Sequence, residues 1–343
     1  MNPTIAVAMS GGVDSLVAAS LLRDKGLPLF GVHFLTGYNT REQCSRLEKA
    51  TRRIGIPLHV ADFTAAFQEL VVDPYVQAYQ RGRTPNPCAL CNRAMKFGVL
   101  SQYARVLGAD MLATGHYARL CRDEDGRVHL LRGIDTRKDQ SYFLAFLTQE
   151  QLSRACFPLG GRTKKSVLQL AQREGLLDLA SKESQESCFV RERHYGDFLA
   201  KQRGFSIEPG PIVDLTGRHL GTHPGLHRFT VGQRRGINCP ARKAYYVVRI
   251  EPQGRRLIVG HREHLLSPSC EVTDINWIRD PDLSVMHVSV KIRYRHRNVS
   301  CTVVPRNRRG ALVHFKTPQS AVTPGQAAVF YSEEEVVGGG WIR

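Results

Sequence analysis

The fold is set by the stretch Ile5-Ala6-Val7-Ala8-Met9-Ser10-Gly11-Gly12-Val13-Asp14-Ser15, near the start of the chain. Five apolar residues in a row predict a buried strand, and the amphipathic run from Val13 predicts a helix. A glycine turn between a strand and a helix directs backbone N–H groups toward one point, which suits an anion. The Gly-Lys-Ser/Thr of a Walker loop is missing. Two adjacent glycines alone would equally suit a plain turn capped by Asp14.

Strand-like and helix-like stretches then alternate through the first 200 residues. We expect strands at Ile5–Met9, Leu29–Phe34, Leu58–Val60 and Met111–Thr114. The expected helices are Val13–Lys25, Arg41–Ile54, Lys96–Leu107, Gln149–Cys156, Lys164–Glu174 and Tyr195–Lys201. Such alternation is typical of an α/β domain in which a doubly wound parallel sheet carries helices on both faces.

After Gly204 the alternation of strands and helices ends, and Pro-Gly turns separate short β-rich runs. Examples are Ala244–Ile250, Arg256–Val259 and Val288–Tyr294. This pattern predicts two small β-rich modules, the last of them a β-barrel. We therefore expect three domains: residues 1–200 for catalysis, 201–262 as a central β-rich module and 263–343 as the barrel.

Composition narrows the class of protein. The chain has 343 residues, a formal net charge of +17 and ordinary hydrophobic and charged fractions of 42% and 23%, which exclude wholesale disorder. It lacks an apolar run of membrane-spanning length and a secretory signal, so we expect a cytoplasmic protein. Nine cysteines, an odd number, indicate mostly reduced thiols rather than a disulfide framework. The basic excess, densest after residue 200, favours a nucleic-acid partner without proving one.

A second informative stretch is Arg83-Thr84-Pro85-Asn86-Pro87-Cys88-Ala89-Leu90-Cys91-Asn92. Its prolines stiffen the chain ahead of Cys88 and Cys91. Lys96 and Arg93 follow closely enough to lower a thiol pKa, and the thiolate is the reactive form. Cys188 is a third candidate. The residues alone leave open a redox pair, inert buried thiols, or a structural zinc site completed by His194 or His116.

Taken together, six blocks in this order resemble the tRNA-specific 2-thiouridylases, a family within the N-type ATP pyrophosphatases that share the PP-loop. The blocks are Ser10–Ser15, Gly82–Phe97, Ala113–Arg119, Lys138–Leu144, Ser187–Phe189 and Phe229–Gly236. The resemblance implies that residues 1–200 are a PP-loop ATP-binding catalytic domain, that 201–262 are a tRNA-contact domain and that the barrel of 263–343 is a tRNA-binding domain. It also implies ATP and Mg²⁺ as cofactors, with Asp14 near the metal.

Site residues are carried over from this resemblance position by position. The implied ATP-binding residues are Ala8, Met9, Ser10, Gly11, Gly12, Val13, Asp14, Ser15, Phe34 and Gly115, with Phe34 where the family usually has Met. The implied tRNA-binding residues are Asn86, Pro87, Cys88, His116, Lys138, Asp139, Gln140, Arg293, Tyr294 and Gln326, the first three bordering the target base. The implied catalytic residues are Cys91 as nucleophile and Cys188 as persulfide carrier, with Cys88 beside them.

The implied reaction is ATP-dependent transfer of sulfur to C2 of the wobble uridine, position 34, of tRNA. ATP would adenylate O2, and sulfur from Cys188 would displace AMP. The family pattern is Asn-Pro-Asp-x-x-Cys, but Cys88 replaces the Asp here. Three cysteines (Cys88, Cys91 and Cys188) could then ligate a [4Fe-4S] cluster with one open iron, so a cluster stays open beside the persulfide as sulfur carrier.

The resemblance further implies tRNAs for Lys, Glu and Gln, a cysteine desulfurase or sulfur-relay carrier as donor, no membrane, and a monomer. Two other classes remain open. One is a PP-loop adenylating synthetase that uses a nitrogen nucleophile on tRNA and needs no reactive thiols. The other is an RNA-binding protein without catalysis, which would release no pyrophosphate.

Overall fold

The computed structural model describes residues 2–181, 187–192, 194–280 and 284–343. The chain divides into two compact units. The first comprises Met1–Val71, Cys88–Phe189 and Glu334–Val337, and the second comprises Val72–Pro87, Val190–Glu333 and Gly338–Arg343. Within the described ranges, no helix is both long and apolar enough to cross a membrane.

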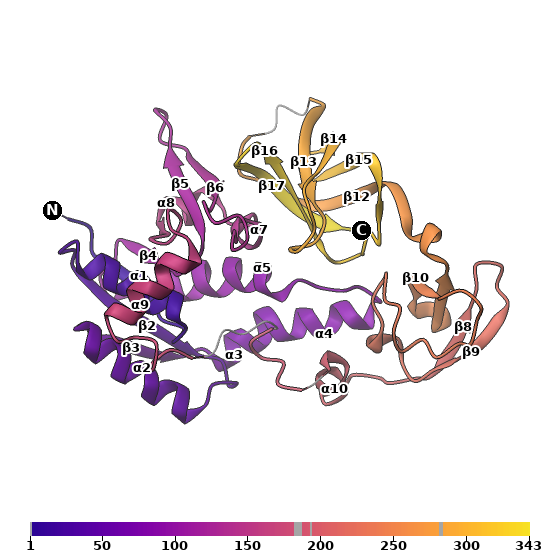
Figure 1. Ribbon diagram of the computed structural model, residues 1–343, viewed down its shortest axis with the longest axis horizontal. Helices are drawn as coiled ribbons and strands as arrows, with labels where there is room; N and C mark the ends of the chain where they lie inside the picture. Colours follow the sequence, from indigo (N-terminus) through magenta and orange to yellow (C-terminus); the bar gives the residue numbers. More distant parts are fainter. Residues whose placement is uncertain (1, 182–186, 193, 281–283) are drawn as a thin grey trace. The chain divides into compact units, whose positions relative to one another are not determined.

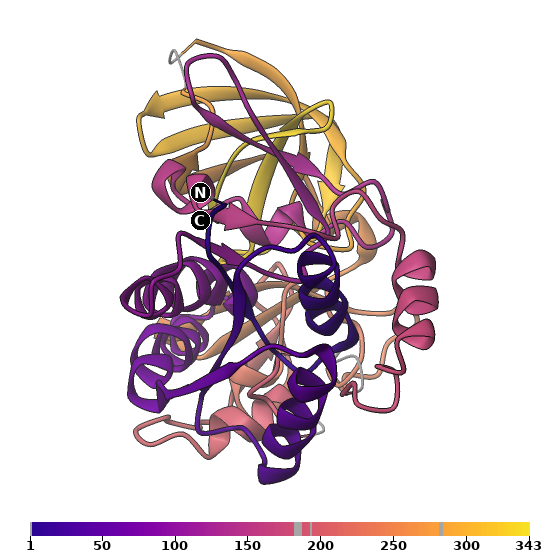
Figure 2. The same cartoon turned by 90° about the vertical axis from the view of Figure 1, so that its left-hand side faces the viewer.

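The first unit is built on a five-stranded parallel sheet in the order β3-β2-β1-β4-β7 (Figure 1). Its strands are β1 (Ile5–Ala8), β2 (Leu29–Leu35), β3 (Leu58–Asp62), β4 (Met111–Ala113) and β7 (Ala155–Cys156). The main helices are α1 (Val13–Arg23), α2 (Arg41–Ile54), α6 (Ser101–Val106) and α9 (Lys164–Arg173). Helices α1, α2 and α9 share one core, and Figure 2 shows the purple helices on the opposite side of the indigo strands. The predicted doubly wound parallel sheet is confirmed.

The order of strands creates a switch point at β1. The chain winds outward through β2 and β3 on one side of β1, then returns to place β4 on its other side. Ligands of open α/β sheets bind at such a point, beyond the carboxyl ends of the strands. Residues 10–12 follow β1 and residues 114–116 follow β4, so both segments lie at that edge of the sheet.

Two of the expected helices differ from the structure. In place of one helix over 96–107, the chain forms α5 (Pro87–Cys91), the π-helix η2 (Asn92–Leu100) and α6 without a break. The expected helix 149–156 ends early as α8 (Gln149–Ser153), and Ala155–Cys156 adds the fifth strand. A two-residue strand has no periodicity to detect, so this strand was not predictable from the sequence.

The remaining elements of the first unit are short. They are α3 (Thr64–Phe67), η1 (Gln68–Val72, which runs into the second unit), the hairpin β5 (Ala118–Arg122) and β6 (Val128–Arg132), and α7 (Ser141–Leu144).

The second unit contains a four-stranded sheet, β10-β11-β8-β9, with a small apolar core around Phe229 and Val247. Its strands are β8 (Gly210–Val213), β9 (His219–His223), β10 (Tyr246–Glu251) and β11 (Arg256–Gly260). Short helices accompany it: α4 (Asp73–Gln80), α10 (Tyr195–Ala200), η3 (Leu226–Arg228), η4 (Pro252–Gly254) and η5 (Arg262–Leu265). These strands form one of the two expected β-rich modules.

Six antiparallel strands make the other β-rich module, in the order β12-β15-β14-β13-β16-β17. They are β12 (Leu266–Trp277), β13 (Met286–Lys291), β14 (Val299–Asn307), β15 (Gly310–Ser320), β16 (Ala327–Ser332) and β17 (Glu335–Ile342). Pairing of β12 with β17, from Val272–Ile342 to Trp277–Gly338, closes the predicted barrel. One expected strand is displaced, because β13 ends at Lys291 and not at Tyr294. The boundaries at 200 and 262 stay predictions.

Candidate functional site

The glycine loop after β1 is held in a tight turn by its own hydroxyls. Gly11 has a φ of +79°, a conformation that favours glycine. The Ser15 hydroxyl donates to the Gly12 carbonyl at 2.9 Å, and the Ser10 and Ser15 hydroxyls lie 3.2 Å apart. Helix α1 begins at Val13, directly after the turn. The N-terminus of an 11-residue helix and the turn thus lie together at the switch point, as an anion site requires.

Gly115 packs directly against this loop. A Cβ on Gly115 would lie 2.7 Å from the Asp14 carbonyl carbon and 2.8 Å from the Ser15 nitrogen. Both atoms are backbone atoms that cannot rotate away, so any larger residue would displace the start of α1. The segment after β4 therefore supports the glycine loop from the neighbouring strand.

Asp14 is the charged centre of the loop. Its carboxylate accepts a hydrogen bond from the Tyr117 hydroxyl at 2.8 Å, and the Lys164 ammonium donates to both of its oxygens, at 2.8 and 2.9 Å. A carboxylate at this edge is the ligand that Mg²⁺ takes from a protein when phosphates supply further oxygens, so the donor set fits that ion.

Sequence analysis missed Lys164 and Tyr117. Lys164 is the first residue of α9, where a cation is unfavourable because the helix N-terminus carries partial positive charge. A lysine at this unfavourable position was the feature of the sequence that could have indicated a role for Lys164. Tyr117 lies inside a block that the resemblance singled out, but nothing in its spacing linked it to Asp14.

Phe34 and His33 lie near the end of β2. The Phe34 ring packs against Phe63 with centroids 6.4 Å apart. Burial lowers the pKa of His33, and its neutral ring donates from Nδ1 to the Met9 carbonyl at 2.7 Å. His33 thereby ties β2 to the residue that precedes the loop. No motif or spacing in the sequence indicates this role for His33.

The three candidate cysteines lie in the first unit and interact with one another. Cys88 and Cys91 are on α5, and Cys188 precedes a buried Phe189. The charge of a Cys188 thiolate acts on both other thiols, and that of Cys88 acts on Cys91. Cys88 and Cys188 keep exposed surface and Cys91 is half-buried, but the protein around each thiol still removes much of the sulfur's hydration. These thiols come from positions up to 100 residues apart in the chain, counted from 88 to 188, and lie close enough for their charges to act on one another.

Burial shifts the pKa values of these three thiols more than neighbouring charges do. Burial raises the pKa of Cys91 to about 12 and also raises the pKa values of Cys88 and Cys188. The Lys96 ammonium lowers all three pKa values, but by less than burial raises them. The predicted effect of Lys96 is confirmed in direction, but the net pKa shift is upward. The spacing of cations along a chain does not indicate how strongly a thiol is desolvated.

The arrangement does not fit the iron–sulfur alternative. Over the ranges of chain that the structure describes, no three His, Cys, Asp or Glu side chains are grouped so that they could hold a metal ion. The same observation leaves the structural zinc alternative without a ligand set among these residues.

The pH dependence of Cys91 follows from its raised pKa. A thiol with a pKa of about 12 is almost wholly protonated at neutral pH, so we expect its alkylation rate to rise about tenfold per pH unit from pH 7 to 10. Iodoacetamide labelling with peptide mass spectrometry measures this rate. Lys96→Ala should slow labelling at every pH, because it removes the charge that favours the thiolate. A plateau near pH 8.5, as for a free thiol, would contradict the expectation.

The implied tRNA contacts of the first unit have internal partners. His116 is buried, its Nδ1 lies 2.7 Å from the Thr114 hydroxyl, and burial together with Lys96 holds its pKa well below the usual range. Asp139 is buried and accepts from Gly133 N, Ser141 N and the Ser141 hydroxyl. Gln140 bonds the Tyr117 backbone, and Lys138 is half-buried. Contact with tRNA stays a prediction for all four.

Two of the implied tRNA-binding residues in the second unit, Arg293 and Gln326, also bond to other parts of the protein. Arg293 donates to the Val231 and Ala321 carbonyls, both at 2.9 Å, and Gln326 donates to Thr84 O and Pro85 O at 2.9 and 3.2 Å. Arg293 and Tyr294 lie in the turn after β13, not in a strand. Asn86 is buried and Pro87 begins α5. Arg293 and Gln326 thus brace backbone segments, and their predicted contact with tRNA is untested.

Comparison with known proteins identifies the class. Residues 3–192 match the model of the tRNA methyl transferase HUP domain, 196–261 that of its PRC-barrel domain, and 267–342 the aminomethyltransferase beta-barrel domain. Curated relatives are named tRNA-specific 2-thiouridylase MnmA. The one from Desulfosudis oleivorans is 52% identical over 100% of this chain and 95% of its own. That from Geobacter metallireducens is 48% identical over 98% and 96%.

The chain therefore belongs to the tRNA-specific 2-thiouridylases, a family of enzymes. The resemblance drawn from the six sequence blocks is confirmed. Among solved structures, a 4-thiouridine synthetase bound to RNA and ATP is similar over 54% of this chain and 44% of its own, with 19% identity and a TM-score of 0.38.

Proposed function

We propose that this enzyme uses ATP to activate a uridine of tRNA and replaces the activated oxygen with sulfur. One packing contact and a set of charge effects in the first unit carry the proposal. Gly115 packs on the glycine loop at Asp14 and Ser15, and the next residue, His116, interacts with Lys96. Lys96 in turn interacts with all three thiols. An anion loop and a thiol cluster are thus linked through two adjacent residues.

In the first step, the loop residues Ala8–Ser15 would hold the phosphates of ATP, with Phe34 beside the adenine and Gly115 below the loop. Asp14 would hold Mg²⁺, which supplies charge neutralisation for the pyrophosphate. Lys164, which pairs with Asp14, would add a positive charge beside the same phosphates. Uridine O2 would attack the α-phosphorus, forming an O2-adenylate and releasing pyrophosphate. This turns a poor leaving group into AMP.

In the second step, the terminal sulfur of a Cys188 persulfide would attack C2 and displace AMP. Cys91 would then attack the Cys188 sulfur, which frees the 2-thiouridine and leaves a Cys91–Cys188 disulfide. A thiol reductant returns both cysteines to their reduced forms. In the alternative order, Cys91 attacks the persulfide first and releases sulfide as the nucleophile.

The target atom, the tRNAs, the residues that contact them and the sulfur donor are assigned from the resemblance to the family. We propose C2 of uridine 34 as the target, in tRNAs for Lys, Glu and Gln, with Asn86, Pro87 and Cys88 bordering the base. His116, Lys138, Asp139, Gln140, Arg293, Tyr294 and Gln326 are the proposed tRNA contacts. The sulfur donor would be a cysteine desulfurase or a relay carrier, and the enzyme would act as a cytoplasmic monomer.

The test combines two readouts on one reaction. The protein is incubated with ATP, Mg²⁺, cysteine, a cysteine desulfurase and a tRNA transcript with a UUU anticodon. We expect pyrophosphate release that depends on tRNA, and 2-thiouridine in the digested nucleosides by mass spectrometry. Pyrophosphate with a nitrogen-containing product would indicate a ligase, and none would indicate a pure RNA binder. Cys88→Asp, which restores the family residue, should stay active, because the persulfide route needs only Cys91 and Cys188.

A further inference from the structure

The helix that follows Cys91 is wound more widely than an α-helix. The π-helix η2 (Asn92–Leu100) has nine residues, and Cys91 is its N-cap residue. At its far end the Ser101 N–H donates to the carbonyls of Lys96 and Gly98, five and three residues back. π-helices are rare, are mostly single-turn bulges, and are frequent at functional sites. A π-helix of this length therefore needs a feature of the structure that stabilises it.

The side chain of Gln151 supplies that stabilisation. Gln151 lies on α8, and its amide nitrogen donates to the carbonyls of Arg93 and Phe97 in η2, at 2.9 and 3.1 Å. In an α-helix, the Phe97 carbonyl would accept from Ser101 N–H, which here bonds elsewhere. An amide has two N–H donors, and Gln151 uses both on η2. Gln151 thus bonds a carbonyl that the wider winding leaves outside the α-helical pattern.

The orientation of the Gln151 amide is fixed from its own helix. Its Oε1 accepts from Thr148 N at 3.1 Å, and the Thr148 hydroxyl accepts from Gln151 N at 3.2 Å. These two bonds form the capping box at the start of α8. Because the oxygen of the amide is held by the backbone of Thr148, the nitrogen is directed toward η2. All of these residues belong to the first unit.

The winding of η2 determines where the Lys96 side chain lies. Lys96 is five residues after Cys91. Five residues of α-helix turn by about 500°, which would leave Lys96 about 140° around the helix axis from Cys91. The i→i+5 bonding of a π-helix instead brings a residue back over the one five positions before it. Lys96 is thereby placed where its charge acts on Cys88, Cys91 and Cys188.

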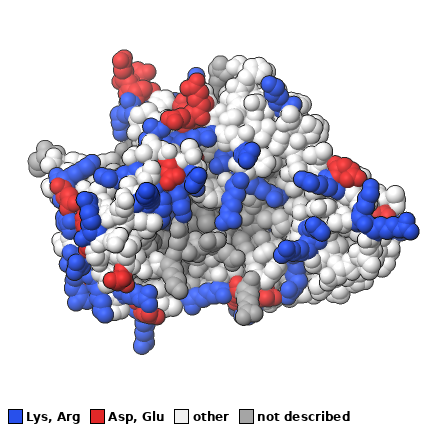
Figure 3. Space-filling view, viewed as in Figure 1, with Lys and Arg blue, Asp and Glu red and all other residues white. Residues whose placement is uncertain are grey.

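Lys96 also differs from many basic residues in its neighbours. On the face that Figure 3 shows, acidic groups adjoin several of the basic ones, and Arg23 and Arg119 of the first unit pair with carboxylates. Lys96 is half-buried, and no carboxylate that the structure describes lies within ion-pair distance of it. Its charge acts on the three thiols and on His116. That charge is therefore available to an anionic sulfur.

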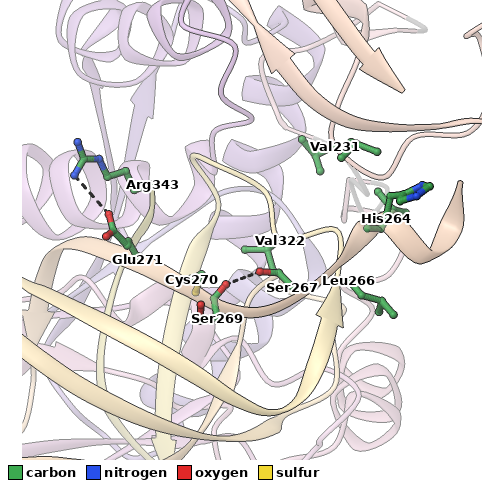
Figure 4. Close-up of a pocket in the computed structure, with 11 residues that line it drawn as sticks. Val231, His264, Leu266, Ser267, Ser269, Cys270, Glu271, Val322 and Arg343 are labelled. Carbon is green, nitrogen blue, oxygen red and sulfur yellow. Dashed lines mark hydrogen bonds and ion pairs between the residues drawn. The ribbon is translucent and has the colours of Figure 1, made fainter. Parts of the chain in front are cut away.

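Two cavities of the protein do not contribute to this arrangement. They measure about 500 and 390 Å³ and are lined by residues of the second unit alone. In the larger one, Glu271 pairs with Arg343, and the Ser267 hydroxyl donates to the Ser269 carbonyl (Figure 4). The position of Lys96 beside the thiols therefore depends on the winding of η2 and not on the wall of either cavity.

We propose that Gln151 is a positioning residue for sulfur transfer, because it holds η2 in its wide winding and so keeps the Lys96 ammonium beside Cys91 and Cys188. The inference rests on the proposed function for the reaction of these sulfurs, but not for the position of Lys96. In the second step the attacking sulfur carries negative charge, which a fixed ammonium stabilises. Without Gln151, η2 would rewind toward an α-helix and carry Lys96 around the axis, away from the thiols.

The test compares two ways of breaking the capping box. Gln151→Leu removes both donors to η2 without changing charge, and Gln151→Met, which keeps the unbranched shape, is made in parallel. The matched control, Thr148→Ala, removes the threonine hydroxyl from the box but leaves the Gln151 amide and its bond to the backbone. Each variant is also combined with Lys96→Ala, and thermal melts show which of them fold.

The readouts are the rate of Cys91 alkylation by iodoacetamide at a single pH, the rate of 2-thiouridine formation, and tRNA-dependent pyrophosphate release. For Gln151→Leu and Gln151→Met we expect the first two rates to fall at least about twofold, the lower end of coupling within one hydrogen-bond network. Neither variant should slow them further once Lys96→Ala is present, because the path from Gln151 to the thiols runs through Lys96. Pyrophosphate release should be unchanged, and Thr148→Ala should leave all three rates unchanged.

Two results would overturn the inference. One is alkylation of Cys91 at the unaltered rate in folded Gln151 variants. The other is an equal slowing by Gln151→Leu with and without Lys96→Ala, which would show that the glutamine only supports the fold. If the unaltered enzyme forms no 2-thiouridine, the proposed function fails instead, and the alkylation rates still decide the role of Gln151.

Discussion

Cys91→Ser is expected to abolish 2-thiouridine formation, by about 10³-fold or more, while tRNA-dependent pyrophosphate release stays near that of the unaltered enzyme. The two effects separate because adenylation uses the loop after β1, whereas release of the thiolated base requires a sulfur nucleophile at position 91. A serine hydroxyl at this buried position cannot replace it, since its pKa is far above that of a thiol. Cys188→Ser should give the same pair of results.

The measurement follows both products in one reaction, pyrophosphate by a coupled assay and 2-thiouridine by mass spectrometry. Cys121→Ser is the matched control, because Cys121 is an exposed cysteine of the same unit on β5. It should change neither product. Persistent thiolation by Cys91→Ser would contradict the assigned role, and loss of pyrophosphate release would show that the two steps share residues.

Lys164→Ala and Asp14→Asn are expected to reduce tRNA-dependent pyrophosphate release by about 10²–10³-fold. Asp14 is the carboxylate of the loop, and Lys164 is the cation that donates to both its oxygens. Loss of either leaves the phosphates of ATP without a charge that is fixed in place before they bind. Alkylation of Cys91 should be unchanged, because neither residue is among the groups that act on its thiol.

The control for this pair is Lys165→Ala. Lys165 is the next residue of α9 and is exposed, so the variant loses the same charge from the same helix without touching Asp14. Pyrophosphate release should stay within about threefold of the unaltered enzyme. An equal loss in Lys165→Ala would mean that the effect comes from the general charge of the helix rather than from the contact with Asp14.

Local signals in the sequence predicted the parallel sheet well. The helix over 41–54 was predicted at its true bounds from its amphipathic pattern and from Gly55, which ends the helix in the left-handed conformation. In the structure, a capping box of Thr40 and Gln43 also fixes its start. The same analysis missed β7 and displaced the end of β13. Those elements depend on pairing with strands distant in sequence, which leaves no periodic trace in so few residues.

Only the parts of the candidate site that lie in sequence motifs were predicted. The glycine loop and the cysteines were found because each has a distinctive spacing, and the six ordered blocks indicated the family. The contacts of Lys164, Tyr117 and His33 could not be found in this way, since each joins residues that only the folded sheet brings together. The net rise of the thiol pKa values was not predictable for a related reason, because desolvation depends on the three-dimensional surroundings.

The closed barrel has a consequence for how the chain is made. All five strands of the parallel sheet are complete once Cys156 has been synthesised, so that sheet can assemble while the ribosome is still translating the rest. The barrel cannot, because β12 finds its closing partner only when β17 emerges, after residue 335. Until then two edges of the sheet carry unpaired backbone groups, which can form hydrogen bonds with other nascent chains. Slow translation late in the message would prolong that exposure and reduce the yield of usable enzyme.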